Sequence, residues 1–337
     1  MNKKKILVTG ASGFIGSFVV EQGLARGYEV WAGIRAGSSR QFLKAEGIKF
    51  IELNINKKDK LQNQINAFVQ ENGGWDYVVH AAGATKCIDK KDFLQTNYTG
   101  TRNLIETLKK SNSTPKKFIY LSSLSIFGPA REEEPHTPIT DSDQAFPNTA
   151  YGHSKLMAEA YIRKCGIPYI ILRPTGVYGP RERDYYQMAV SIKKHIDFAV
   201  GYKKQTITFI YVKDLVKAIY LSIEKDVTNR CYFVSEPKGY SSRSFSDYIQ
   251  KYLGVKWVLH ITAPIWLLKT ISSIAEKIAR AKNKAATLNS DKYNIMKQRN
   301  WLCDTTPIEQ ELGFTIDYNL ERGTEETINW YKQEKWL

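Results

Sequence analysis

The sequence predicts an α/β protein with a doubly wound parallel sheet and a smaller, mainly helical C-terminal lobe. Three observations lead to this prediction. Short apolar runs of β type alternate with helical patterns through the first half of the 337 residues, and a glycine-rich turn follows the first run. Beyond about residue 240, helical periodicity dominates. Strands with few polar residues are typical of a parallel sheet that helices cover on both faces.

The expected strands and helices alternate from the start of the chain. Runs rich in β-branched and aromatic residues predict strands at Lys5–Thr9, Glu29–Ile34, Lys49–Leu53, Tyr77–Ala81, Phe118–Ser122 and Tyr169–Leu172. Apolar residues at helical spacing predict helices at Phe14–Arg26, Lys60–Gln70, Phe93–Lys110 and Ala150–Lys164. Because strand–helix–strand connections are right-handed, this order predicts a Rossmann-like sheet with helices on each face.

The pattern changes at "RPTGVYGPRERD" (Arg173–Asp184), where Gly and Pro interrupt the alternation. Gln205–Ile223 has the pattern of a strand that turns into a helix and returns to the first lobe. Residues 241–337 are expected to be mainly helical. We therefore predict a cofactor-binding lobe of residues 1–180 plus about 205–235, and a substrate-binding lobe of about 181–204 and 236–337.

Composition limits the function classes. Hydrophobic content is 42% and charged content 25%, which is ordinary for a globular protein. The four cysteines lack CxxC spacing, so reduced thiols are expected and a metal site is not. The start, "MNKKK", lacks the features of a secretory signal, which favours the cytoplasm. The net charge of +15 is spread along the chain rather than gathered in an arginine-rich block, so no nucleic-acid partner is predicted.

The stretch "ILVTGASGFIGSF" (Ile6–Phe18) places Gly10, Gly13 and Gly16 between a strand and a helix. Amide N–H groups at a helix N-terminus attract phosphate, and glycines allow a tight turn and close approach of the backbone. The spacing is GxxGxxG rather than GxGxxG, and a tight turn without a ligand is the alternative. The position after the first strand favours dinucleotide binding. The loop residues expected at the cofactor are Gly10, Ser12, Gly13, Phe14, Ile15 and Gly16.

The end of the second expected strand indicates which dinucleotide is bound. An acid about 20 residues past the glycines would hold a ribose hydroxyl, whereas an arginine would accept a 2′-phosphate. "YEVWAGIRAGSSR" offers Arg35 followed by Ser38, and no acid. A permanently charged guanidinium suits a phosphate. NADP(H) is therefore favoured over NAD(H), unless Arg35 simply points into solvent.

"FIYLSSLSIFG" (Phe118–Gly128) and "YGHSK" (Tyr151–Lys155) carry the candidate chemistry. Tyr151 and Lys155 are four residues apart and share one face of a helix. A nearby ammonium is expected to lower the pKa of the tyrosine, which would then exchange a proton with an alcohol or carbonyl. A serine at the end of the neighbouring strand could polarise the same oxygen.

These motifs together resemble the extended short-chain dehydrogenase/reductases, the NAD-dependent epimerase/dehydratase superfamily, over nearly the whole chain. The matching segments are "TGASGFIG", "HAAGAT" (His80–Thr85), "NYTGTRNL" (Asn97–Leu104), "YGHSK", "LRPTGVYGP" (Leu172–Pro180) and "FIYVKDLV" (Phe209–Val216). The tail Leu288–Leu337 is similar to that of the 3β-hydroxysteroid dehydrogenase-like and dihydroflavonol reductase-like branch.

The resemblance implies a role for each matching position. Ser123 would be the catalytic serine, ahead of its neighbours Ser122 and Ser125; Tyr151 would move the proton; and Lys155 would bind the nicotinamide ribose. Asn97 would be structural or hold a water molecule. A homodimer through the long helices is also implied. The remaining residues implied at the cofactor are Asn54, Ile55, Ala81, Ala82, Gly83 and Pro174.

These features predict an NADP(H)-preferring enzyme that interconverts a secondary alcohol and a ketone or aldehyde. The tail and the aromatic residues Tyr178, Tyr185, Tyr186 and Phe198 favour a bulky, apolar or ring-bearing substrate, such as a steroid-like compound, although these aromatics could simply be core. The alternatives are a nucleotide-sugar epimerase or dehydratase, and a cofactor-sensing binding module without catalysis.

The helix expected at Pro264–Lys284 has an apolar stripe, and its charged side chains are mostly basic. This pattern suits an anionic membrane surface, a lid over the substrate, or packing of the helix on its own domain.

Overall fold

A seven-stranded sheet forms the centre of the protein, in the strand order β10-β6-β5-β4-β1-β2-β3. The computed structural model describes residues 3–282, 284, 286 and 288–337. Every pairing in this sheet is parallel, which confirms the predicted doubly wound fold. Its strands are β1 (Lys5–Thr9), β2 (Glu29–Ile34), β3 (Lys49–Glu52), β4 (Tyr77–His80), β5 (Lys117–Leu121), β6 (Tyr169–Pro174) and β10 (Arg230–Val234).

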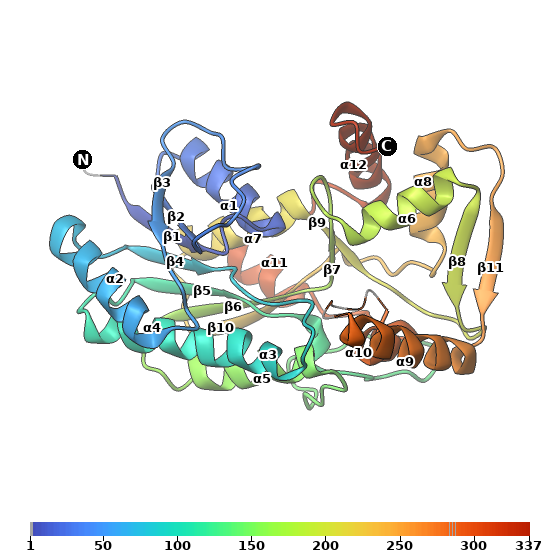
Figure 1. The fold of residues 1–337 in the computed structure, drawn as a ribbon, viewed down its shortest axis with the longest axis horizontal. Helices are drawn as coiled ribbons and strands as arrows, with labels where there is room; N and C mark the ends of the chain where they lie inside the picture. Colours follow the sequence, from blue (N-terminus) through green and yellow to red (C-terminus); the bar gives the residue numbers. More distant parts are fainter. Residues whose placement is uncertain (1–2, 283, 285, 287) are drawn as a thin grey trace.

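Helices cover both faces of this sheet (Figure 1). Strand residues alternate between two cores, because successive side chains point to opposite faces: Ile6 and Val8 belong to one core and Leu7 to the other. The first core receives α1 (Phe14–Ala25), α7 (Val212–Glu224) and α11 (Thr306–Leu312). The second receives α2 (Lys58–Asn72), α4 (Gly100–Lys110) and α5 (Ala150–Ile162).

The long helix expected at Phe93–Lys110 is not regular. It begins as α3 (Lys91–Phe93), continues through the π-helical turn η1 (Leu94–Thr99) and becomes α4 only at Gly100. Apolar periodicity could not show this turn, which contains the buried Asn97. The other predicted elements of the sheet and its helices are present, with ends that differ by up to two residues.

The rest of the chain forms a smaller lobe at the carboxyl edge of the sheet (Figure 1). An aromatic-rich core holds it together. Its elements are α6 (Asp184–Lys193), β8 (Ile196–Val200), α8 (Ser244–Leu253), β11 (Leu259–Ala263), α9 (Ile265–Ala281), α10 (Ser290–Lys297) and α12 (Leu320–Gln333).

Sequence reasoning missed two small sheets. β8 and β11 pair in parallel, within a region read as mainly helical. The strand predicted within Gln205–Ile223 is β9 (Phe209–Tyr211), which pairs with β7 (Gly176–Tyr178) rather than with the central sheet. The helix expected to follow it is α7, which packs on the sheet as predicted. In the part of the chain that the structure describes, none of the helices combines the length and apolar character needed to cross a bilayer.

Candidate active site

The glycine loop lies where the carboxyl ends of β1 and β4 meet. Gly10 has φ +68°, and a Cβ on it would lie 2.7 Å from the backbone nitrogen of Ala82. A Cβ on Gly16 would collide with the carbonyl oxygen of Gly10. A side chain at Gly10 would therefore push the loop away from the sheet, and one at Gly16 would push α1 away from the loop. The loop can lie flat against Ala81 and Ala82 only because these positions are glycine.

The N-terminus of α1 is suited to a phosphate. Gly13 is its N-cap, and the first turn reads Phe14, Ile15, Gly16, Ser17, which includes no acid. The amide N–H groups of a first helical turn have no partner within the helix. A Cβ on Gly13 would meet only the Gly10 carbonyl oxygen, at 3.2 Å, so a ligand could approach the backbone at Gly13 closely. These residues fit the pyrophosphate of a dinucleotide.

A hollow lies beyond the end of β2. Arg35 is exposed there, and its backbone N–H donates to Ser38 Oγ at 3.2 Å. Asn54 borders the same hollow, but the side chain of Ile55 is buried in the core instead. The residues that line this hollow are Ile34, Arg35, Ala36, Gly37, Ser38, Arg40, Phe50, Glu52, Asn54 and Lys60.

Ser123 and Tyr151 come together at the carboxyl end of β5. Ser123 begins the short turn η2 (Leu124–Ile126), and its Oγ donates to Ser125 Oγ at 3.0 Å. Tyr151 lies in the first turn of α5. Burial raises the pKa of Tyr151 to about 12, and the nearby Ser123 side chain opposes this shift. The prediction of a lowered tyrosine pKa is therefore not met in this structure.

Lys155 lies one helical turn beyond Tyr151. Its Nζ donates to the carbonyl oxygen of Leu121 at 2.7 Å and is 6.0 Å from the centre of the Tyr151 ring. Burial lowers the pKa of Lys155 to about 8, and Glu159 opposes this shift. A Cβ on Gly83 would lie 3.3 Å from Nζ, so the glycine leaves room for the ammonium group. Gly83 and Lys155 thus meet between the ends of β4 and β5.

Asn97 is fully buried in the π-helical turn. Its Oδ1 accepts from the N–H of Ala84 at 2.7 Å, and its Nδ2 donates to the Ala84 carbonyl at 3.0 Å. Nδ2 also lies 2.9 Å from Ser154 Oγ. These contacts tie the loop after β4 to α5, so they favour the structural role over the water-holding one.

Three further contacts fix this region, and sequence reasoning missed all of them. Asp291 of α10 accepts from the backbone N–H groups of Ala150 and Tyr151 at 2.9 and 3.4 Å. Arg173 of β6 and Glu159 of α5 form a buried ion pair, Nη2 to Oε2, at 2.8 Å. His80 bridges two threonines, and burial lowers its pKa to about 3.

Only one of the three left a signal in the sequence. Glu159 stands eight residues after Tyr151, two helical turns along, and it interrupts an apolar helix face, as a buried ion-pair partner does. Asp291 left none, because it contacts residues that are 140 or more positions away in the chain.

The aromatic residues expected to line a ring pocket have other positions. Tyr178 is almost fully buried, and its hydroxyl donates to the Asn319 carbonyl at 3.3 Å. Tyr185 and Tyr186 pack against the same core, whereas Phe198 is exposed on β8. The alternative that these aromatics are core is therefore correct for Tyr178, and Phe198 belongs to another surface. Pro174 ends β6, where it pairs in register with Val234.

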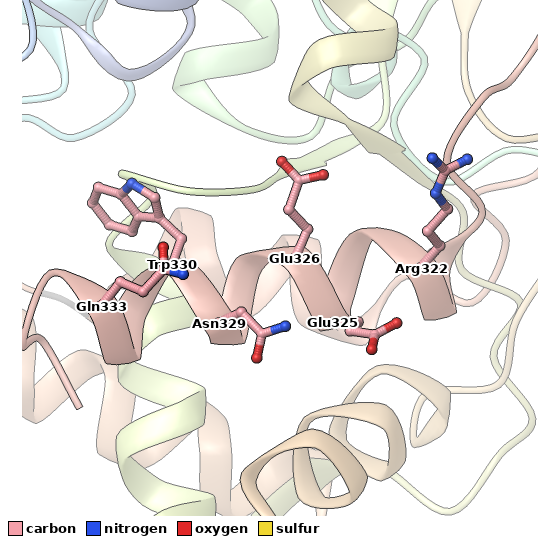
Figure 2. A pocket seen from close by; sticks show the side chains of 6 residues that line it. All are labelled: Arg322, Glu325, Glu326, Asn329, Trp330 and Gln333. Atoms are coloured by element: carbon pink, nitrogen blue, oxygen red, sulfur yellow. The ribbon is translucent and has the colours of Figure 1, made fainter.

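A second hollow runs along α12, away from the predicted residues. Figure 2 shows that its side chains point to both flanks of the helix. The residues that line it are Arg322, Glu325, Glu326, Asn329, Trp330 and Gln333. None of them was predicted as a site residue, and we assign no role to this hollow.

Comparison with known proteins agrees with this arrangement. Residues 6–234 match the family described as NAD dependent epimerase/dehydratase. The chain therefore belongs to that family. Similar proteins are named as dehydratases, epimerases and decarboxylases, and this chain is an enzyme of the same NAD-dependent family. The predicted resemblance to extended short-chain dehydrogenase/reductases is thus confirmed.

Family members similar to this chain span its full length. The UDP-N-acetyl-alpha-D-glucosaminuronate decarboxylase of Bacillus cytotoxicus is 25% identical and covers 98% of both chains. The sterol-4-alpha-carboxylate 3-dehydrogenase of Dictyostelium discoideum is 23% identical over 96% of this chain and 99% of its own. The structure of UDP-glucose 4-epimerase from Thermotoga maritima with UDP-glucose superposes with a TM-score of 0.77, at 22% identity, covering 98% of this chain and 99% of that one.

Proposed function

We propose that this family member acts on the sugar of a nucleotide sugar, through reversible oxidation of a ring hydroxyl to a ketone. The reaction type follows from one observation: Ser123 and the buried Lys155 both lie beside Tyr151, next to the glycine loop. The substrate class follows from the relatives. Several that match both lobes carry names of nucleotide-sugar enzymes, among them dTDP-glucose 4,6-dehydratase of Haemophilus influenzae, 24% identical over 97% of each chain.

The bound nicotinamide would accept a hydride from the substrate carbon and return it. Tyr151, in its phenolate form, would take the hydroxyl proton as the C–H bond breaks, and would give it back when the ketone is reduced. Ser123 donates a hydrogen bond to the reacting oxygen and orients it toward Tyr151. Lys155, whose Nζ is anchored on the Leu121 carbonyl, would hold the cofactor ribose, and its charge would offset part of the cost that burial places on the Tyr151 phenolate.

NADP(H) is the proposed cofactor, with NAD(H) as the alternative. Arg35, Arg40 and Lys60 border the hollow beyond β2, and a 2′-phosphate there would meet three cations. One acid, Glu52, borders it too, and Lys60 pairs with that carboxylate at 2.6 Å. The solved structure of WbmG from Bordetella bronchiseptica contains NAD, but at 22% identity it indicates the fold alone.

The predicted division into lobes also stays a proposal. Residues 1–180 and about 205–235 would bind the cofactor, since β10 and α7 join the central sheet. Residues of about 181–204 and 236–337 would bind the substrate, except that α11 packs on the central sheet and so belongs to the cofactor lobe. A cytoplasmic homodimer through the long helices is proposed on the family resemblance.

A second candidate is oxidation of a lipophilic, ring-bearing alcohol. It was the main prediction from the sequence, and the sterol-4-alpha-carboxylate 3-dehydrogenase relative favours it. The aromatic residues cited for it do not form a pocket wall at Tyr178, because that side chain is core. The nucleotide-sugar reading is therefore preferred.

A ligand-protection experiment separates these candidates. The protein is loaded with NADPH or NADH, and thermal unfolding is followed with UDP-glucose, UDP-N-acetylglucosamine, dTDP-glucose or a polycyclic alcohol. A ligand at a hundred times its Kd should stabilise the protein by about 2.7 kcal/mol. We expect a nucleotide sugar to raise the Tm, and mass spectrometry to show its conversion.

Tyr151→Phe serves as the matched control, because it should bind the same sugar without converting it. An epimerase reaction leaves cofactor absorbance unchanged after turnover, whereas net oxidation of an alcohol changes it. Protection by polycyclic alcohols alone would establish the second candidate. Protection by a nucleotide sugar without conversion in any cofactor state would indicate a binding module.

A further inference from the structure

The long helix α9 presents its apolar ridge to solvent. Leu268 and Ser272 face inward, with 6% and 1% of each residue exposed. Ile271, Ile274 and Ile278 face outward, with 45%, 53% and 52% exposed. α9 thus packs on its own domain through a narrow face that includes Ser272, while Ile271, Ile274 and Ile278 stay uncovered. The end of the expected helix includes residue 283, which lies outside the described residues.

The exposed apolar surface continues where α9 begins. Trp266 in its first turn is 69% exposed, and Tyr202, in the loop after β8, is 76% exposed. That loop lies against α9, because a Cβ on Gly201 would be 3.3 Å from the side chain of Ile265. Figure 1 shows β8 and β11 ending together at the corner from which α9 runs inward.

The two-stranded sheet beside this corner also has an uncovered apolar face. Phe198 and Ile261 are register partners, and both are exposed. Their neighbours Asp197 and His260 are register partners too. Asp197 is buried, and its Oδ2 lies 2.8 Å from Nη1 of Arg243. Phe198 and Ile261 therefore lie exposed on this small sheet although their neighbour Asp197 is buried.

The charges around this surface are almost all positive. Lys269, Lys277 and Lys282 are exposed on and just after α9, and Lys203 and Lys204 are exposed beside Tyr202. The single acid in the sequence of α9, Glu276, points toward α10, where its Oε2 accepts from the Ser290 N–H at 3.0 Å. The outer surface of α9 thus combines an apolar ridge, aromatic residues at one end and lysines alongside.

We propose that this surface docks on an anionic lipid bilayer. Its residues, together called the docking surface below, are Tyr202, Lys203, Lys204, Trp266, Lys269, Ile271, Ile274, Lys277, Ile278 and Lys282. Isoleucines enter the acyl boundary, Trp and Tyr prefer the headgroup level, and lysines attract anionic headgroups. A second copy of this chain fits less well, because a two-fold contact would place the same lysines opposite one another in a region where interfaces avoid charge.

Docking would place the candidate active site next to the membrane. Glu276 links α9 to Ser290 of α10, and the neighbouring Asp291 binds the first turn of α5. The docking proposal does not depend on the proposed substrate, since lipid binding is measured without turnover.

Vesicle binding tests the proposal. The full-length protein is sedimented with vesicles of phosphatidylcholine containing about 30% phosphatidylglycerol, and with pure phosphatidylcholine. We expect binding to the anionic vesicles, weakening strongly in about 1 M salt, where the Debye length falls to about 3 Å. Trp266→Ser should weaken it by about tenfold or more, the loss expected for one large apolar side chain. Phe146→Ser is the matched control, because Phe146 is 75% exposed but lies in the loop before α5.

A charge-matched pair of variants separates location from net charge. Lys269→Gln/Lys277→Gln/Lys282→Gln lowers the net charge by the same amount as Lys44→Gln/Lys110→Gln/Lys164→Gln, whose exposed lysines lie outside the docking surface. We expect the first variant to lose about fivefold in affinity per lysine and the second to bind as wild type. Equal effects, or no binding to anionic vesicles, would overturn the proposal.

Light scattering, which measures the molecular mass, tests whether a second copy of this chain covers the docking surface instead. Ile271→Ser/Ile274→Ser/Ile278→Ser should leave the molecular mass unchanged while vesicle binding falls. A wild-type dimer that becomes a monomer in this variant, without vesicle binding by either, would assign the surface to a second copy of the chain instead.

Discussion

Asp291 of α10 holds the first turn of α5 from outside, with its Oδ2 atom 2.9 Å from the backbone nitrogen of Ala150. The same oxygen lies 3.4 Å from the nitrogen of Tyr151, and Lys90 approaches the other carboxylate oxygen at 3.3 Å. A carboxylate at this end of a helix is favoured by the helix dipole. The C-terminal part of the chain therefore fixes the position of the proposed proton donor.

Asp291→Ala should lower kcat by about tenfold, since small displacements of a reacting group are costly. It should lower the free energy of unfolding by about 1 kcal/mol, as loss of a helix cap does. Asp291→Asn keeps an acceptor oxygen and should restore most of kcat. Steady-state kinetics and denaturant unfolding measure both effects.

Asp304→Ala is the matched control for this prediction. Asp304 accepts at 3.0 Å from the N–H of Thr306, the first residue of α11, and α11 carries none of the proposed catalytic residues. It should lose stability without losing kcat. A proportional loss of kcat in both variants would show that Asp291 acts through stability alone.

Tyr151→Phe should reduce turnover by a factor of about 10² or more, the scale of general acid–base catalysis. Cofactor affinity and the Tm should change little, because the ring stays in place against Phe93, 6.0 Å away. Tyr161→Phe, near the end of the same helix, controls for loss of a tyrosine hydroxyl on α5. Turnover near the wild-type rate in Tyr151→Phe would remove the residue from the mechanism.

Lys155 should make stability depend on pH. Its pKa is about 8 in the folded protein against 10.5 for an unperturbed lysine. Between these values the unfolded chain binds more protons, so the free energy of unfolding rises with pH. Relative to Lys155→Met, the wild type should gain about 2 kcal/mol from about pH 7 to about pH 9.5. Urea unfolding at several pH values measures the difference, and a flat difference would contradict the lowered pKa.

Arg35→Asp should weaken NADPH binding far more than NADH binding, because it removes a cation and places an acid near the 2′-phosphate. Fluorescence titration of both cofactors on both proteins gives the ratio, and NADH affinity serves as the internal control for folding. A wild type that prefers NADH, or an unchanged ratio in the variant, would contradict the assignment to Arg35.

The sequence by itself determined the central sheet and the positions of the glycine loop, Ser123, Tyr151 and Lys155. These follow from local rules: apolar runs mark buried strands, glycine marks a turn that no side chain fits, and a four-residue spacing places two side chains on one helix face. Such signals lie within a few residues of the feature they predict, so they can be read without knowing what else is nearby.

Only the tertiary structure decided what surrounds these residues. Burial, not Lys155, sets the pKa of Tyr151, and Asp291 reaches α5 from 140 positions away. The same holds for α9: periodicity predicted its apolar ridge, but only packing shows that Leu268 turns inward while Ile274 stays outside. Burial and contact between distant segments depend on how the whole chain packs, and no local pattern in the sequence encodes them.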